Sequence, residues 1–155
     1  MSTTQANRIE DDMIHPMFPW YFIPLITYWD NELVEPEKHF QFVHSFFFEH
    51  KTTSQFFNIL DPIVEKLKAK SFIRIKANCI TMTDKHILHG FHNDYDDNVT
   101  AIYYVNTNNG YTMFESGEKI PSVQNQLATF DGNQRHCSVV QTDTSARYII
   151  NINIL

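Results

Sequence analysis

The sequence is poor in cysteine, and it lacks any long hydrophobic run. Its 155 residues include two cysteines, Cys79 and Cys137, and both lie in strand-like segments. No stretch reaches the roughly 18 apolar residues of a membrane span. Residues 1–13 show no basic region followed by an apolar one. We therefore expect free thiols, no disulfide framework, no signal peptide, no membrane segment and a cytoplasmic protein.

Positive charge is also scarce. Twelve lysines and arginines stand against 18 aspartates and glutamates, which gives a formal net charge of −6. Nucleic-acid binding needs clustered cations, so this balance argues against a nucleic-acid partner. The 43% hydrophobic content, with 13 phenylalanines, provides for a filled core. The length suits one domain over residues 1–155, in which we expect residues 1–13 to form a flexible arm.

Only four glycines occur, and all lie between or beside short segments rich in β-branched and aromatic residues. These segments are FIRIKANCITM, VTAIYYVN, YTMFE, QLATF, CSVVQ and RYIININIL. Before them, residues 18–30 and 39–50 predict two more strands. The spacing of apolar residues within 53–70 predicts a helix, with Pro62 starting a second helical piece. We expect a mainly β protein with one or two helices, a jelly roll whose core spans residues 71–155.

A polar stretch, HGFHNDYDD, precedes the second of these segments and contains a candidate metal site. His92 and Asp94 are one residue apart, so at a strand end both side chains point to the same face. His136 is the only histidine after Asp94, and it is the candidate for a third ligand from a distant strand. Two imidazoles and one carboxylate are the ligand set of non-haem Fe(II) oxygenases. A His-x-Asp pair also arises without function in many sequences, and His136 alone is equally compatible with a turn.

Arg147 lies inside an apolar strand segment, SARYIININ. A charged side chain in a buried strand is costly unless it meets an anion. A guanidinium fork suits a carboxylate better than an ammonium does, so Arg147 is a candidate for holding the far carboxylate of a dicarboxylate. The alternative is a structural ion pair with one of the loop aspartates.

The ordered set of His92-Asn-Asp94, TAIYYVN, NNGYTMFESG, His136 and RYIININ resembles the 2-oxoglutarate and Fe(II)-dependent dioxygenases of the prolyl 4-hydroxylase type. The resemblance covers a little over half of the chain. It implies a double-stranded β-helix, the cupin-like jelly roll, in which His92, Asp94 and His136 hold iron. It also implies that Arg147 and Tyr104 bind the C5 carboxylate of 2-oxoglutarate.

Other positions of the implied cosubstrate site fit the family less closely. Thr100, four residues before Tyr104 on the same strand face, would line the same pocket. Where prolyl hydroxylases carry a tyrosine before the His-x-Asp loop, this chain has Ile80, and Asn78 on the same face is the candidate replacement. A small hydroxyl residue, frequent two places after the arginine, is replaced by Ile149.

The resemblance implies an oxidoreductase that hydroxylates an unactivated C–H bond with Fe(II), 2-oxoglutarate and O₂, with ascorbate as a reductant. A prolyl residue in a peptide is the first substrate it implies, and a free amino acid or another small metabolite is the second. Two other interpretations stay open. One is a non-catalytic jelly-roll module for binding or structure, and the other is a cupin-like metalloenzyme that does not use 2-oxoglutarate.

Overall fold

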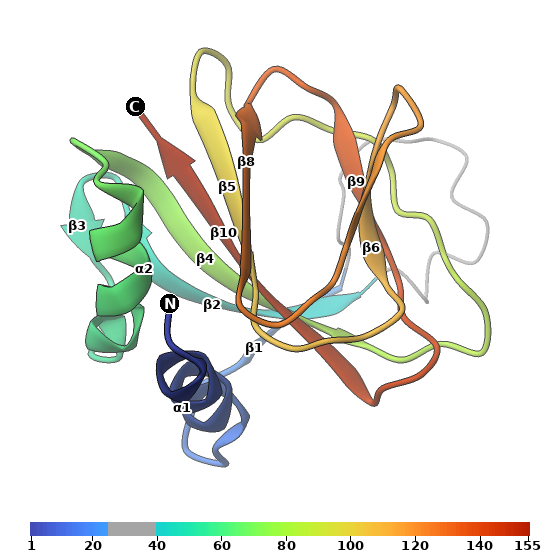
Figure 1. Ribbon diagram of the computed structural model, residues 1–155, viewed down its shortest axis with the longest axis horizontal. Coiled ribbons are helices and arrows are strands. Elements are labelled where there is room, and N and C mark those ends of the chain that lie inside the picture. Colours follow the sequence, from blue (N-terminus) through green and yellow to red (C-terminus); the bar gives the residue numbers. More distant parts are fainter. Residues whose placement is uncertain (25–39) are drawn as a thin grey trace.

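The computed structural model describes residues 1–24 and 40–155, in which helices lie on one side of two β-sheets (Figure 1). The helical segments of this part of the chain are α1 (Thr3–Ile14), the 3₁₀ turn η2 (Phe57–Leu60) and α2 (Asp61–Leu67). The strands are β1 (Tyr21–Ile23), β2 (Gln41–Phe48), β3 (Lys51–Thr52), β4 (Phe72–Thr81), β5 (Val99–Tyr104), β6 (Tyr111–Phe114), β7 (Lys119–Pro121), β8 (Gln126–Asp131), β9 (His136–Val139) and β10 (Ala146–Ile154).

The larger sheet has the order β1-β2-β4-β10-β5-β8, with β3 beside β2. At its centre β4 and β10 pair antiparallel, from Arg147 opposite Ile80 to Asn153 opposite Arg74. β5 pairs with the other edge of β10 and places Thr100 opposite Asn153. The smaller sheet has the order β7-β6-β9 and lies across from the larger one, on the side away from the helices (Figure 1).

Side chains alternate between the two faces of the larger sheet. The face toward the helices is apolar. Its buried core includes Ile9, Met13, Leu60, Ile63, Ile75, Ala77, Ala101, Tyr103, Ile150 and Ile152. The opposite face, which we call the polar face, carries Arg74, Lys76 and Asn78 on β4, Thr100 and Tyr104 on β5, and Arg147, Asn151 and Asn153 on β10. All the candidate residues of the larger sheet therefore lie on the side of the smaller sheet.

Most elements predicted from the sequence are present. The six β segments predicted from residue 72 onward are confirmed as β4, β5, β6, β8, β9 and β10. The helix predicted over 53–70 is present as two shorter pieces, η2 and α2, and Pro62 lies in the first turn of the second piece, as predicted. The strand predicted over 39–50 is β2, and the strand predicted over 18–30 is reduced to β1; residues 25–30 and residue 39 lie outside the described residues. The short β7, which ends in a proline, is absent from the prediction.

The prediction of a flexible arm at residues 1–13 is wrong. Ser2 caps α1 through a capping box, in which its side chain accepts the backbone N–H of Gln5. Ile9 and Met13 recur on one face of the helix and belong to the buried core. The helix is therefore held to the sheet by apolar contacts.

Replacing Ile9 with alanine is expected to lower the free energy of unfolding by about 2–4 kcal/mol, because the buried side chain leaves a cavity. Ile9 is 2% exposed, whereas Ile14 on the same helix is 51% exposed. The matched change Ile14→Ala is therefore expected to cost less than about 0.5 kcal/mol. Urea unfolding of both variants measures the difference. Equally small effects would show that α1 does not pack on the sheet.

Candidate metal centre

The segment between β4 and β5 brings the first candidate ligands to β9. Leu88 forms an isolated antiparallel bridge with Val139, and His92 forms another with His136. The His92 backbone N–H donates to the His136 carbonyl at 3.0 Å, and the His136 N–H donates to the His92 carbonyl at 2.9 Å. The centroids of the two imidazole rings consequently lie 4.9 Å apart. Two histidines that are distant in the sequence thus share one place in the fold.

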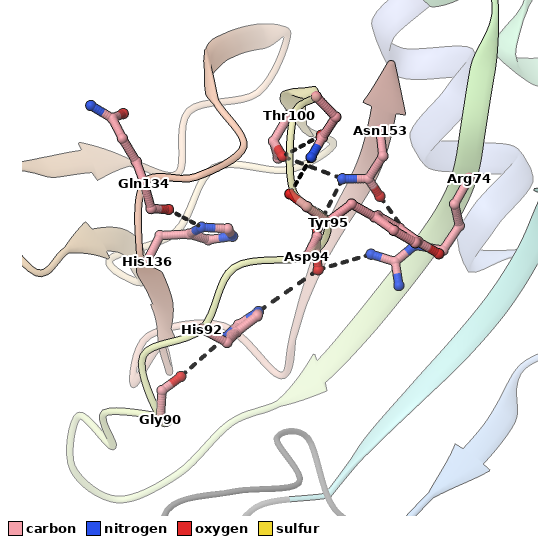
Figure 2. Close-up of polar contacts among 10 residues, drawn as sticks. Arg74, Gly90, His92, Asp94, Tyr95, Thr100, Gln134, His136 and Asn153 are labelled. Atoms are coloured by element: carbon pink, nitrogen blue, oxygen red, sulfur yellow. Dashed lines mark hydrogen bonds and ion pairs between the residues drawn. The ribbon is translucent and has the colours of Figure 1, made fainter. Parts of the chain in front are cut away.

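Backbone carbonyls orient both imidazoles (Figure 2). His92 Nδ1 lies 3.0 Å from the Gly90 oxygen, and His136 Nδ1 lies 3.0 Å from the Gln134 oxygen. A carbonyl oxygen only accepts, so each Nδ1 carries the proton and each Nε2 keeps a lone pair. His136 Nε2 is buried and has no hydrogen-bond partner among the described residues. Burial lowers the pKa of His136 and favours the neutral form, in which histidine binds metals.

Asp94 lies beside His92 but is held by other residues (Figure 2). Its Oδ1 is 3.9 Å from His92 Nε2 and 2.9 Å from Arg74 Nη2. Its Oδ2 accepts from Asn153 Nδ2 at 3.2 Å. Burial raises the pKa of Asp94, but Arg74, His92 and Asn153 outweigh this effect and lower the pKa to about 2. The carboxylate is therefore ionised and nearly buried, with a cation beside it.

The residue types at this place fit a ferrous ion, since two imidazoles and one carboxylate lie near one another. The orphaned Nε2 of His136 is the observation that fits a metal best. Among the described residues, however, no three His, Cys, Asp or Glu side chains lie close enough together to hold a metal ion as they stand. Neighbouring ligand atoms of an octahedral ion lie about 3.0 Å apart. The distance from His92 Nε2 to Asp94 Oδ1 is longer, at 3.9 Å. Ligation requires the Asp94 carboxylate to turn from Arg74 toward the imidazoles, so convergence on one ion stays a prediction.

Arg147 is fully buried on the polar face, and its partners are neutral. Its Nε donates to Ser122 Oγ at 2.7 Å. Its Nη1 donates to Ser138 Oγ at 2.6 Å and to the Val139 carbonyl at 3.3 Å, and its Nη2 lies 3.5 Å from Thr112 Oγ1. No ion pair within the part of the chain that the structure describes includes Arg147. The alternative of a structural pair with a loop aspartate is thus not supported. Burial lowers the pKa of Arg147 to about 10, which leaves it charged near neutral pH.

Tyr104 lies beside this guanidinium. Its ring centroid is 5.8 Å from Arg147 Cζ, and its hydroxyl donates to Thr112 Oγ1 at 2.8 Å. Burial raises the pKa of Tyr104, so the hydroxyl keeps its proton. Gly110 packs closely against Arg147. A Cβ at this position would lie 2.9 Å from the Val139 carbonyl oxygen and 3.1 Å from Arg147 Cδ, so a larger residue would not fit without a shift. The buried cation and the phenol together form one end of the polar face.

Ser138 connects the two halves of the candidate site. It lies two residues after His136 on β9, so the two side chains point to the same side of the strand, about 7 Å apart along it. Because Ser138 contacts Arg147, the guanidinium lies on the His136 side of β9. A short dicarboxylate can span such a separation.

The two remaining candidates lie elsewhere on the polar face. Thr100 is buried near Asp94, and its hydroxyl accepts from Asn153 Nδ2 at 3.3 Å. The structure thus places Thr100 with the candidate metal ligands instead of beside Arg147. Asn78 lies on the central strand β4, and its Oδ1 is buried without a hydrogen-bond partner among the described residues. Both residues share the face that the strand alternation predicts, and their roles stay predictions.

Several residues of the site were not among the sequence candidates. They are Arg74 and Asn153, which hold Asp94, and Ser122, Ser138 and Thr112, which hold Arg147. Arg74 shows the signal that singles out Arg147, a cation inside an apolar strand. The hydroxyl residues show no comparable signal, because serine and threonine are common on any half-exposed strand.

In metal-free protein, Asp94→Asn is expected to lower the free energy of unfolding at neutral pH by about 2 kcal/mol. The pKa of about 2 in the folded state lies below the ordinary value of 3.8, so the carboxylate stabilises the fold above that value. This contribution is lost as the pH falls toward 2, and the difference between wild type and variant should shrink over that range. Denaturant unfolding with a chelator present measures it.

Asp97 provides the matched control for this change. It lies in the same loop, is exposed, and has a φ of 54°, a conformation that asparagine adopts readily. Asp97→Asn is expected to leave stability and its pH dependence unchanged. A destabilisation by Asp94→Asn that stays constant from neutral to acid pH would contradict the ionised, paired state of Asp94.

Comparisons with known proteins identify the fold. No protein-family model and no curated protein matches the sequence. The viral collagen prolyl hydroxylase of Paramecium bursaria Chlorella virus-1, in its 2OG complex, aligns with a TM-score of 0.54 at 15% identity, over 74% of this chain and 78% of that one. A prolyl hydroxylase from Trichoplax adhaerens, in complex with a hypoxia inducible factor peptide fragment, aligns with a TM-score of 0.52 at 14% identity, over 74% of this chain and 62% of that one. A predicted oxalate decarboxylase from Thermotoga maritima aligns with a TM-score of 0.47 at 11% identity, over 75% of this chain and 81% of that one.

The chain has a jelly-roll fold. The fold class predicted from the sequence, mainly β with one or two helices in a jelly roll, is thereby confirmed. At these identities the similarity shows the fold alone. Both cysteines are free and buried, as expected. Within residues 1–24 and 40–155, no helix has the length and apolar character that crossing a membrane requires.

Proposed function

We propose that this chain is an Fe(II)- and 2-oxoglutarate-dependent dioxygenase that hydroxylates an unactivated C–H bond. Arg147 supports this most strongly. It is a fully buried guanidinium whose described partners are all neutral, and it contacts Ser138, two residues from the orphaned Nε2 of His136. A buried cation without a counter-charge is costly. A carboxylate of a bound ligand removes that cost.

In this proposal His92, Asp94 and His136 hold the iron, and Arg147 and Tyr104 hold the C5 carboxylate of 2-oxoglutarate. Iron and 2-oxoglutarate would supply, when bound, the electrons that activate O₂, the oxidant, which no side chain at this site can do. The ligand set of two imidazoles and one carboxylate leaves coordination positions open for a chelating cosubstrate and O₂.

The protein contributes geometry to this chemistry. The carbonyls of Gly90 and Gln134 fix the imidazoles, which is the usual way in which a protein orients metal-binding histidines. Ser122 and Ser138 fix the guanidinium, so little conformational entropy is lost when a carboxylate binds it. Asn78 is the candidate for a further contact to the cosubstrate, which it would make through its amide N–H donors, because 2-oxoglutarate offers only acceptors.

For the substrate we propose a prolyl residue in a peptide or a free amino acid, with ascorbate as reductant and with residues 1–155 acting as one domain. Two of the solved structures reported above are prolyl hydroxylases, and one of them is in complex with a peptide fragment.

Conversion of 2-oxoglutarate to succinate tests the proposed function. Purified protein supplied with Fe(II), ascorbate, 2-oxoglutarate and O₂ is expected to form succinate. His92→Ala and Asp94→Ala should each abolish this activity, while Asp97→Asn in the same loop should retain it. Succinate formation that survives both ligand changes would refute the proposal, and so would its absence from the wild type.

The ion pair between Arg74 and Asp94 favours a second candidate function, a jelly-roll binding or structural module without iron. In such a module Asp94 is satisfied by Arg74 and Asn153 and needs no metal. The module predicts that a redox-stable divalent ion such as Mn(II) leaves the melting temperature unchanged. The oxygenase predicts a rise in melting temperature with Mn(II) concentration, since the ion binds only the folded state.

A further inference from the structure

The polar face carries more positive charge than the proposed cofactors neutralise. Three cations lie on this face: Arg74, Lys76 and Arg147. Among the ion pairs of the described residues, one carboxylate, Asp94, pairs with one of them, Arg74. Iron brings two positive charges and 2-oxoglutarate two negative ones. Binding of both therefore leaves the net charge of the polar face unchanged. Two positive charges are therefore left to be matched by something else.

Lys76 is the cation that the proposed function does not use. It lies on β4, two residues from both Arg74 and Asn78, and strand alternation places all three on one face. Across the sheet it lies opposite Asn151 on β10 and Ser45 on β2. Arg74, its neighbour on that face, contacts Asp94 (Figure 2). Lys76 therefore faces the same side of the sheet as the candidate metal ligands.

The polar groups around Lys76 are only partly satisfied. The Lys76 side chain is half-buried, and no ion pair within the described parts of the chain includes its ammonium. Burial lowers the pKa of Lys76 to about 8, Arg74 adds to this effect, and Asp94 opposes it. Next to it, Asn78 and Asn151 each present a buried amide oxygen without a described partner. Buried polar groups are normally hydrogen-bonded, so this set is suited to a ligand that brings both an anion and N–H or O–H donors.

We propose that Lys76, with Arg74 beside it, binds an acidic group of the substrate, which is therefore a carboxylic acid carrying an amino or hydroxyl group. The carboxylate pairs with the Lys76 ammonium, and the amide oxygens of Asn78 and Asn151 accept from the donor groups of the same molecule. The inference rests on the proposed function for what happens to the bound acid, but the binding itself requires no iron. It narrows the substrate to a free amino or hydroxy acid, or to an acidic residue of a peptide.

Matched pairs of acids and amides test this on the metal-free protein. L-proline is compared with L-prolinamide, and L-alanine with L-alaninamide, by titration in ligand-observed NMR, because each amide lacks the only carboxylate of its acid. We expect each acid to bind about tenfold more tightly than its amide, because a charge-assisted hydrogen bond replaces a neutral one. Lys76→Met should remove this preference, and Lys70→Met, which changes an exposed lysine, should keep it. A capped peptide, acetyl-Gly-Asp-Gly-amide, distinguishes a peptide carboxylate from a free acid.

Three results would each overturn the inference: equal affinity for acid and amide, no binding of any acid, or a preference that persists in Lys76→Met. If Lys76→Met does not fold, Lys76→Gln, which keeps a polar end without the charge, takes its place. Turnover of 2-oxoglutarate is measured separately. Its failure would refute the oxygenase, while the acid preference at Lys76 would stand or fall on the titration alone.

Discussion

Replacing Arg147 with methionine is expected to weaken the binding of 2-oxoglutarate by at least about 100-fold. Methionine keeps an unbranched chain but removes the guanidinium, so the far carboxylate of the ligand would be buried without a counter-charge. Arg147 is 0% exposed, and water cannot replace the lost partner cheaply at such a site. Anaerobic calorimetric titration with Mn(II) in place of Fe(II) measures the affinity without turnover.

Two further variants separate the charge of Arg147 from its shape. Arg147→Lys keeps the charge but not the planar fork, and an intermediate affinity is expected. Arg135→Met removes an exposed arginine next to His136 that pairs with Glu115 at 3.3 Å, and it should leave the affinity unchanged. Thermal unfolding shows whether each variant is folded, and Ser122→Ala, which removes one hydroxyl partner, is a milder change. Wild-type affinity in folded Arg147→Met would exclude the guanidinium as the anchor.

The change His136→Ala is expected to weaken metal binding by more than about 100-fold, and succinate formation should be lost with it. Loss of a residue that only supports a ligand costs about 10- to 100-fold in metal affinity, so loss of a ligand should cost more. The Nε2 of His136 is also buried without a hydrogen-bond partner among the described residues, and it is the atom that would bind the proposed metal. Electron paramagnetic resonance of Mn(II) measures free and bound ion directly.

His86 provides the control for this change. It is an exposed histidine on the segment that leads to His92, and its Nδ1 lies 2.7 Å from the Val140 carbonyl oxygen. His86→Ala removes an imidazole of the same region without touching the candidate ligands, and it should leave metal binding intact. Equal Mn(II) affinity of His136→Ala and the wild type would remove His136 from the ligand set.

Strand alternation was sufficient to predict most of the sheet. In VTAIYYV it separates Ala101 and Tyr103, which pack in the core beneath the helices, from Ile102 and Tyr104 on the other side. The helix α1 was missed although its capping box, Ser2 with Gln5, is readable in the sequence. Its apolar positions are few, and they become informative only because the sheet supplies a surface for them.

The cost of burying a charge singled out Arg147, which the structure shows to be fully buried among neutral partners, and its role in binding a carboxylate stays a prediction. The same argument applies to Arg74 and Lys76, which alternate in the apolar strand FIRIKANCITM. The partner of Asp94 could not be predicted, because its ion pair joins a loop to a strand that precedes it in the chain. Contacts of this kind depend on the packing of the whole fold and leave no local pattern.

The central claim is that one site takes a metal at His92, Asp94 and His136 and a carboxylate at Arg147. Anaerobic titration of 2-oxoglutarate with and without Mn(II) tests it most directly, because two ligands that share a site must change each other's affinity by the same factor. We expect one molecule of 2-oxoglutarate to bind per chain, at least about tenfold more tightly with the metal than without it. Binding of 2-oxoglutarate that is indifferent to the metal, or no binding of either, would contradict the claim.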